Sequence, residues 1–259
     1  MSGMKVVILA GGLGTRMREE TEFRPKPMVE VGGKPVLWHI MKIYASHGFK
    51  DFVICTGYKG EQIKDYFYNY ASRNIDFTAQ LGHQSPPRFL ASHDELDWTV
   101  TVADTGQHTP TGGRLNKVRK YLDDQPFLAT YGDSIANVDI ASLLKKHNEL
   151  GKIATVTTAM PRSRFGVVKT DTEGNVLGFV EKPVLGEFVN IGYFVFESAV
   201  FDFLTDESVL EAGPLDGIAS EGGLAAFRHS GFWQPMDTYR ELKVLNELWD
   251  SGSPPWKNW

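Results

Sequence analysis

The sequence predicts an α/β fold built on a doubly wound, mainly parallel sheet. Short apolar runs alternate with amphipathic helical segments through the first half of the chain, which is typical of strand–helix–strand units. The first of these runs ends in glycines and the last in aspartate, as buried parallel strands do where they enter a loop. The second half holds four strand-like runs joined by turns, which indicates a mixed-sheet extension of the first half.

The alternation begins at residues 5–10, a β-branched run that ends in glycines and predicts a buried strand. Residues 34–48 carry apolar side chains at helical spacing and end at Gly48, which suits a helix terminus. The other elements expected in this half show the same two signals. They are strands at 51–58, 98–105 and 126–133 and helices at 60–72 and 115–122.

The second half predicts strands at 152–160, 165–171, 176–183 and 190–197. Residues 172–175, TEGN, predict the hairpin turn between the middle two. Helical spacing returns at 198–204 and 238–250, whereas 81–97 has no clear period and is expected to be a loop. Because no linker or repeat separates the halves, we expect one domain over residues 1–259.

Composition narrows the function classes. The chain has 259 residues, is 42% hydrophobic and carries a formal net charge of −5, so a nucleic-acid partner is not expected. No apolar stretch reaches the length of a membrane span and no signal-peptide pattern is seen, so we expect no membrane and a cytoplasmic location. The single cysteine, Cys55, lies in an apolar run and is expected in the core of a protein from a reducing compartment.

The segment LAGGLGTR at 9–16 follows the first predicted strand. Glycines let backbone N–H groups approach an anion closely, and Thr15 and Arg16 add a hydroxyl and a planar cation suited to phosphate oxygens. The segment lacks the third glycine of a dinucleotide fingerprint, where Met17 stands, so that class is not indicated. A plain strand-to-helix turn is the alternative for this loop.

Three further segments carry candidate charges. In RPKPM, prolines on both sides of Lys26 stiffen the backbone and fix the lysine's direction, although an exposed turn lysine is the alternative. Asp133 in YGDS and Asp237 in GFWQPMD are candidate Mg²⁺ ligands, since Mg²⁺ needs few protein carboxylates when phosphates supply the rest. For both aspartates the alternative is a turn or a helix N-cap. The sequence contains no G-x-S-x-G motif, the turn that presents a nucleophilic serine in hydrolases. It also contains no pair of histidines at the spacing typical of metal ligands.

The combination of these motifs resembles the sugar-phosphate nucleotidyltransferases. The resemblance rests on LAGGLGTR and RPKPM, on TGGRL at 111–115, on YGD, and on GFWQPMDT at 231–238. It spans essentially the whole chain and is closest to the cytidylyl branch of the family. It implies a Rossmann-like doubly wound mixed sheet of the nucleotidyltransferase type, with a β-rich sugar-binding extension. The nucleotide-binding half would be about 1–135 and the sugar-phosphate-binding half about 136–259.

The resemblance also implies substrates, partners and site residues. CTP and glucose 1-phosphate would react to CDP-glucose and pyrophosphate with Mg²⁺, in nucleotide-sugar synthesis for deoxysugars or O-antigen polysaccharide, and the chain would form a homo-oligomer such as a hexamer. Arg16, Lys26 and Asp133 would be catalytic, with Asp133 and Asp237 holding the metal. Glu181, Lys182 and Asn190 would bind the sugar phosphate. The nucleotide would contact Leu9, Ala10, Gly11, Gly12, Leu13, Gly14, Thr15, Arg16, Lys26, Thr109, Arg114 and Gly132.

The sequence departs from the family pattern in places. Arg24 replaces a lysine and keeps its charge, and Ser134 follows Asp133 where a glycine is expected. The segments 81–97 and 210–223 match the pattern poorly, so the sugar is less firmly indicated than the reaction. A thymidylyl- or uridylyltransferase of the same fold is the main alternative. A non-catalytic nucleotide-sugar sensor is a remote one, because it would not need both aspartates.

Overall fold

The computed structural model describes residues 3–82, 86–163, 165–184 and 186–259. Its centre is a seven-stranded mixed sheet with the strand order β14-β10-β13-β8-β1-β4-β7. Within this sheet β13 runs antiparallel to both of its neighbours, and the other pairings are parallel. The strands are β1 (Val6–Ala10), β4 (Asp51–Thr56), β7 (Thr99–Asp104), β8 (Phe127–Tyr131), β10 (Ala154–Ala159), β13 (Val189–Phe196) and β14 (Leu224–Arg228). The predicted α/β class with a mixed sheet is confirmed.

Both faces of the sheet are buried, which gives the molecule two apolar layers. Val6 and Ile8 of β1 belong to one buried cluster, and Val7 and Leu9 belong to the other, as the two-residue period of a strand requires. Side chains of α2 (Val36–Ser46), α6 (Ile140–Leu150) and α8 (Tyr239–Asp250) join the first cluster. Side chains of α5 (Thr111–Val118), η4 (Ser198–Phe203) and α7 (Pro214–Ser220) join the second.

Short elements complete the chain. Two-stranded ladders join β2 (Glu30–Val31) to β3 (Lys34–Pro35), β5 (Phe77–Thr78) to β6 (Arg88–Phe89), β9 (Ser134–Ala136) to β15 (Trp233–Pro235), and β11 (Val167–Thr170) to β12 (Val176–Val180). The remaining helices are η1 (Thr15–Met17), α1 (Arg18–Thr21), η2 (Lys26–Met28), α3 (Gly60–Tyr68), α4 (Tyr70–Asn74) and η3 (Arg119–Tyr121).

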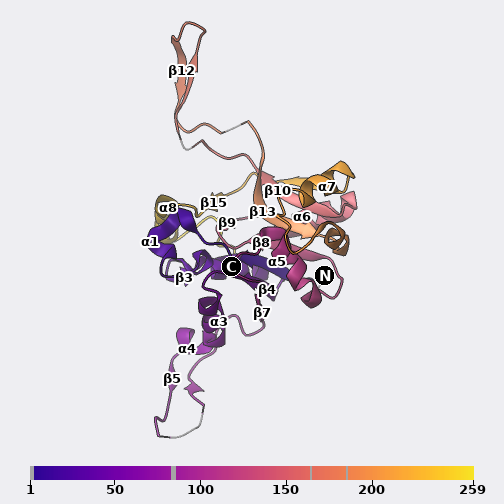
Figure 1. Cartoon of the computed structure of the whole chain (residues 1–259). Coiled ribbons are helices and arrows are strands. Elements are labelled where there is room, and N and C mark those ends of the chain that lie inside the picture. The colour runs from indigo at the N-terminus through magenta and orange to yellow at the C-terminus, as the bar shows by residue number, and fades with distance from the viewer. Residues whose placement is uncertain (1–2, 83–85, 164, 185) are drawn as a thin grey trace.

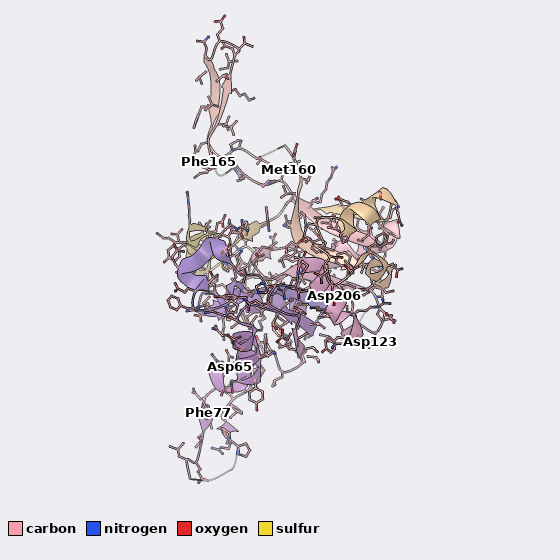
Figure 2. All side chains as sticks on the ribbon, in the orientation of Figure 1. Asp65, Phe77, Asp123, Met160, Phe165 and Asp206 are labelled. Carbon is pink, nitrogen blue, oxygen red and sulfur yellow. The ribbon has the colours of Figure 1, made fainter. Side chains whose placement is uncertain are left out.

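Two hairpin arms leave the body in opposite directions (Figure 1). One ends in β11 and β12, and the other ends in β5 and β6. Figure 2 places Phe165 at the base of the first arm and Phe77 in the second. Phe77 and the apolar side chains of β11 and β12 are exposed.

Several predicted elements have different bounds. The helix expected at 60–72 is interrupted at Asn69, which separates α3 from α4. The helix expected at 115–122 is α5, which begins four residues earlier, at Thr111. Its first turn contains Gly112 and Gly113, poor helix formers, but a Cβ on Gly113 would lie 2.1 Å from the carbonyl oxygen of Asp206. Close packing therefore requires glycine where propensity opposes a helix.

Candidate active site

A cavity of about 620 Å³ opens at the carboxyl ends of β1 and β8. This is the edge of a doubly wound sheet where ligands bind. The residues predicted to bind or act on substrates mostly line it. Those that do are Leu9, Ala10, Gly11, Gly12, Gly14, Thr15, Arg16, Lys26, Thr109, Arg114, Gly132, Asp133, Asn190 and Asp237.

Four charged side chains meet in this cavity. Lys26 Nζ lies 2.8 Å from Oδ2 of Asp133 and 2.7 Å from Oδ1 of Asp237. Arg16 Nη1 lies 2.8 Å from Oδ2 of Asp237. Two cations and two carboxylates, from four separate segments of the sequence, therefore form one cluster.

The backbone holds the two carboxylates in place. Asp133 lies two residues beyond β8 and Asp237 two residues beyond β15, and the β9–β15 ladder pairs Ser134 with Pro235. The N–H of Met236 donates to the carbonyl of Asp133 at 3.0 Å. The position of each aspartate is thus fixed by main-chain hydrogen bonds as well as by its ion pairs.

A capping box at the start of α8 fixes Asp237 further. Thr238 is the N-cap and accepts a hydrogen bond from the N–H of Glu241, whose carboxylate accepts from the N–H of Thr238. The same Glu241 oxygen accepts from the N–H of Asp237 at 2.7 Å. The N-cap predicted as the alternative role for Asp237 is therefore taken by its neighbour, which leaves the Asp237 side chain directed to Lys26 and Arg16.

Lys26 is buried, with 7% of its surface exposed, in the short helix η2. Pro25 precedes it with an extended backbone, Pro27 follows it, and the N–H of Val29 closes the turn on its carbonyl. The alternative of an exposed turn lysine is wrong, because this rigid turn directs the ammonium inward.

Arg114 supports the glycine loop from below. Its guanidinium donates to the carbonyl of Gly11 at 3.0 Å, to the carbonyl of Thr56 at 3.0 Å and to Oγ1 of Thr105 at 2.7 Å. Only 4% of Arg114 is exposed, and burial lowers its pKa. Arg114 therefore links the residues at the carboxyl ends of β1, β4 and β7 and forms part of the cavity wall. Thr109, also in the lining, donates to the carbonyl of Thr105.

Sequence reasoning missed one end of the cavity. Glu211 lines it and accepts hydrogen bonds from the hydroxyls of Tyr131 and of Thr111, the latter at 2.7 Å. Asn190 Nδ2 lies 3.5 Å from the Tyr131 hydroxyl and so borders the same polar group. Glu211 falls within 210–223, which matched the family pattern poorly, and no motif marked it. Burial, with the Glu211 carboxylate adding to it, raises the Tyr131 pKa.

Three predicted residues lie outside the lining of this cavity. Leu13 is 44% exposed at the rim of the glycine loop. Glu181 and Lys182 follow β12 on the projecting arm, where Lys182 Nζ lies 3.7 Å from Oε1 of Glu181. Both side chains are about half exposed, at 62% and 46%. Their sugar-phosphate role stays a prediction.

The donor set suits a divalent cation of the Mg²⁺ type. Asp133 and Asp237 direct one oxygen each to a common point, and Mg²⁺ takes oxygen ligands with few from protein. Among the described residues no group of three or more His, Cys, Asp or Glu side chains is arranged to hold a metal alone. The remaining ligands would come from substrate phosphates and water. Cys55 does not line the cavity; it is buried, and burial raises its pKa to about 12.

Comparison with known proteins agrees with this geometry. The nucleotidyl transferase family model matches residues 5–215, most of the chain. The chain belongs to the nucleotidyl transferase family. It is thus an enzyme of a family whose members typically use a divalent metal ion. Within the ranges that the structure describes, no helix is both long and apolar enough to cross a membrane.

Relatives in this family include proteins of very similar length. The glucose-1-phosphate cytidylyltransferase of Salmonella typhi is 49% identical over 260 residues, covering 99% of this chain and 100% of the relative. The UTP–glucose-1-phosphate uridylyltransferase of a Synechocystis strain is 30% identical, covering 81% of this chain and 53% of the relative. A solved structure of apo UDP-glucose pyrophosphorylase superimposes with a TM-score of 0.68 at 17% identity, covering 96% of this chain and 98% of the other, and supports the fold.

Proposed function

We propose that the chain transfers the cytidylyl group of CTP to α-D-glucose 1-phosphate, giving CDP-glucose and pyrophosphate. The observation that carries the proposal is the convergence of Arg16, Lys26, Asp133 and Asp237 in one cavity beside the glycine loop. The choice of substrates is supported by 49% identity, over nearly the full length of the chain, to a glucose-1-phosphate cytidylyltransferase.

The proposed reaction needs charge compensation more than proton transfer. A phosphate oxygen of the sugar phosphate forms a bond to the α-phosphorus of CTP, and the bond from that phosphorus to the bridging oxygen of pyrophosphate breaks. Because the attacking oxygen already carries negative charge, no general base is required. The chain's task is to hold two polyanions together and to offset their repulsion.

The residues of the cavity divide this task. Backbone N–H groups of the glycine loop and the guanidinium of Arg16 face the nucleotide phosphates, while Lys26 offsets charge at the reacting phosphoryl group. Asp133 and Asp237 would hold Mg²⁺, which supplies electrostatic stabilisation of the phosphate oxygens when bound. Arg114 keeps the loop in position by its bond to Gly11.

The sugar end of the proposed site contains Asn190 and, beside it, Tyr131 and Glu211. Carboxylate and amide groups accept and donate to sugar hydroxyls, so this end suits the hexose. Glu181 and Lys182 remain proposed sugar-phosphate ligands, although they stand on the arm. Their test is the KM of Lys182→Ala, which should rise far more for glucose 1-phosphate than for CTP.

Base choice is the point on which the alternatives differ. The similarity to the Synechocystis uridylyltransferase keeps a uridylyltransferase as an alternative. A thymidylyltransferase is another, because a solved structure described as one has the same fold. A pocket that hydrogen-bonds the cytosine edge would leave buried groups unpaired with uracil or thymine, at about 1–3 kcal/mol for each group. The test is pyrophosphate release with CTP, UTP and dTTP in direct competition, with glucose 1-phosphate as acceptor. Equal use of UTP or dTTP would refute the cytidylyl assignment, and binding without turnover would favour a sensor.

We also propose a homo-oligomer, such as a hexamer, in the cytoplasm. The exposed apolar side chains of the β11–β12 arm support self-association, since monomers rarely leave so many exposed together. A single buried thiol, Cys55, is consistent with a reducing compartment. The pathway, nucleotide-sugar supply for O-antigen polysaccharide, follows only from the proposed product.

A further inference from the structure

Lys26 lies between the carboxylates of Asp133 and Asp237, hereafter the carboxylate pair, and contacts both of them. Its ammonium lies 2.8 Å from one carboxylate and 2.7 Å from the other. The Lys26 side chain is 9% exposed, whereas that of Arg16, which pairs with Asp237, is 68% exposed. Lys26 is therefore the principal counter-ion of the carboxylate pair when no substrate is bound.

We propose that Lys26 keeps the carboxylate pair closed to metal ions until a nucleotide binds. The proposal rests on the proposed function, because it takes Asp133 and Asp237 as metal ligands. A divalent cation entering alone must displace a buried ammonium and leave it without an anionic partner. The phosphates of a bound nucleotide give the Lys26 ammonium a new anionic partner. The two carboxylates are then available to bind a metal ion.

The charges of the cluster support this coupling. Among the described side chains joined by these ion pairs, two carboxylates (−2) are balanced by the two cations Arg16 and Lys26 (+2), which weakens the attraction of the pair for a further cation. When phosphates neutralise the cations, the carboxylates regain a net charge of −2. Since a partly buried pair is screened less than a surface pair, Lys26 should contribute more to this balance than Arg16.

The main chain that carries the two carboxylates does not depend on Lys26 for its position. The backbone of Met236 binds the carbonyl of Asp133, and Glu241 binds the backbone of Asp237. Replacement of Lys26 should therefore leave both aspartates beside the point that the ammonium occupies, and that point becomes available to a cation. A structural lysine needed only to hold the two loops together would give the opposite result, a loss of metal binding.

The test is Mn²⁺ binding to the full-length protein without nucleotide, measured by titration calorimetry and electron paramagnetic resonance. Lys26→Met should bind Mn²⁺ about tenfold more tightly than the wild type, within the usual range of coupling between two sites. Lys26→Arg, which keeps the charge, should bind as weakly as the wild type. Lys243→Met is the matched control, because it removes one lysine charge from the exposed face of α8. An Mn²⁺ affinity of Lys26→Met equal to or below that of the wild type would overturn the proposal.

A further substitution separates this proposal from the proposed function. Adding Asp133→Asn to Lys26→Met should abolish the gained Mn²⁺ site. If wild-type protein with CTP binds Mn²⁺ through Asp133 and forms CDP-glucose, but Lys26→Met gains no affinity, only the role of Lys26 is refuted. If Asp133→Asn changes no Mn²⁺ binding, with or without CTP, the metal site of the proposed function is refuted instead.

A measurement on the wild type covers the case in which the Lys26 variants do not fold. Mg²⁺ at the concentration that saturates turnover with CTP should leave the rate at which Lys26 is acetylated by a water-soluble reagent unchanged when CTP is absent, because the ammonium keeps its two carboxylates. Mass spectrometry measures this rate. Lys243, exposed on α8, provides the reference rate. A rise in the ratio of the Lys26 rate to the Lys243 rate on adding Mg²⁺ alone would contradict the proposal.

Discussion

Asp133 and Asp237 are the two residues on which the proposed chemistry depends most directly. We predict that Asp133→Asn and Asp237→Asn each lower kcat/KM by about two orders of magnitude or more, since loss of a metal ligand costs several kcal/mol of transition-state stabilisation. The thermal unfolding midpoint should change little, because the main-chain hydrogen bonds around both residues remain. Steady-state kinetics and calorimetry measure the two quantities.

Asp104→Asn is the control for this pair, because Asp104 ends β7 outside the cavity lining. It should keep wild-type kinetics. EDTA should abolish wild-type turnover, and added Mg²⁺ should restore it. Full activity of Asp133→Asn, or turnover in EDTA, would contradict the metal role.

His39 makes stability depend on pH. It is fully buried, with Nε2 2.8 Å from the carbonyl of Val31 and Nδ1 accepting from the indole of Trp256. Burial, aided by Lys34, lowers its pKa from 6.5 to about 4. Below pH 6.5 the unfolded chain binds a proton that the native state does not, so stability falls as the pH drops from 6.5 toward 4.

The size of this effect is predictable. The wild type should lose about 3 kcal/mol of unfolding free energy to His39 across that window, at about 1.4 kcal/mol for each pKa unit. His39→Gln cannot titrate, so its unfolding free energy, measured by urea denaturation, should fall less with pH. The advantage of the wild type over His39→Gln should therefore shrink between pH 7 and pH 4.5. A constant difference would show that folding does not lower the pKa of His39.

At the scale of the element, the glycine loop offers a matched pair of substitutions. A Cβ on Gly11 would lie 2.1 Å from Cζ of Arg114, whereas a Cβ on Gly12 would meet no atom within 4 Å among the described residues. Gly11→Ala should therefore displace the buried guanidinium and lower both stability and activity. Gly12→Ala should keep the fold.

Circular dichroism melting and kinetics distinguish the two variants. We expect Gly11→Ala to lose about 1–3 kcal/mol, the usual cost of overpacking a close-packed site. Gly12→Ala should melt within a few degrees of the wild type, although its KM for CTP rises if the nucleotide contacts this backbone. Equal melting of both variants would remove the support role assigned to Arg114.

The whole molecule carries two exposed hairpin arms. On β11 and β12 the apolar side chains are 37–69% exposed: Val167, Val168, Val176, Leu177, Phe179 and Val180. If they are buried between subunits, the double variant Leu177→Lys and Phe179→Glu should lower the mass in solution. Light scattering should give a multiple of 28.9 kDa for the wild type and a smaller assembly for the variant. The control Thr170→Lys on the same arm should keep the wild-type mass, and a monomeric wild type would refute the oligomer.

The sequence alone predicted six of the seven strands of the central sheet, because each of them is a short apolar run. It did not predict β14, and it placed β11 and β12 in an extension of the sheet, whereas they form a separate arm. It also indicated the candidate groups at the strand ends, since Gly11, Lys26, Asp133 and Asp237 stand in local motifs that can be recognised without knowing their distant partners. It could have indicated α6 as well. The segment 139–151 carries an N-cap at Asp139, apolar residues at helical spacing and a left-handed glycine, Gly151, at its end.

Only the tertiary structure decided which charges meet. The Lys26 ammonium, the Asp133 carboxylate and the Asp237 carboxylate form one cluster because the β9–β15 ladder joins chain segments far apart in sequence. Glu211 lies in the cavity because its segment packs against α5. Glu181 and Lys182 lie outside the cavity lining, on the arm that carries β12. Local patterns record how a segment folds and which groups it carries. The distances between groups on different segments depend on long-range packing, and no local pattern contains them.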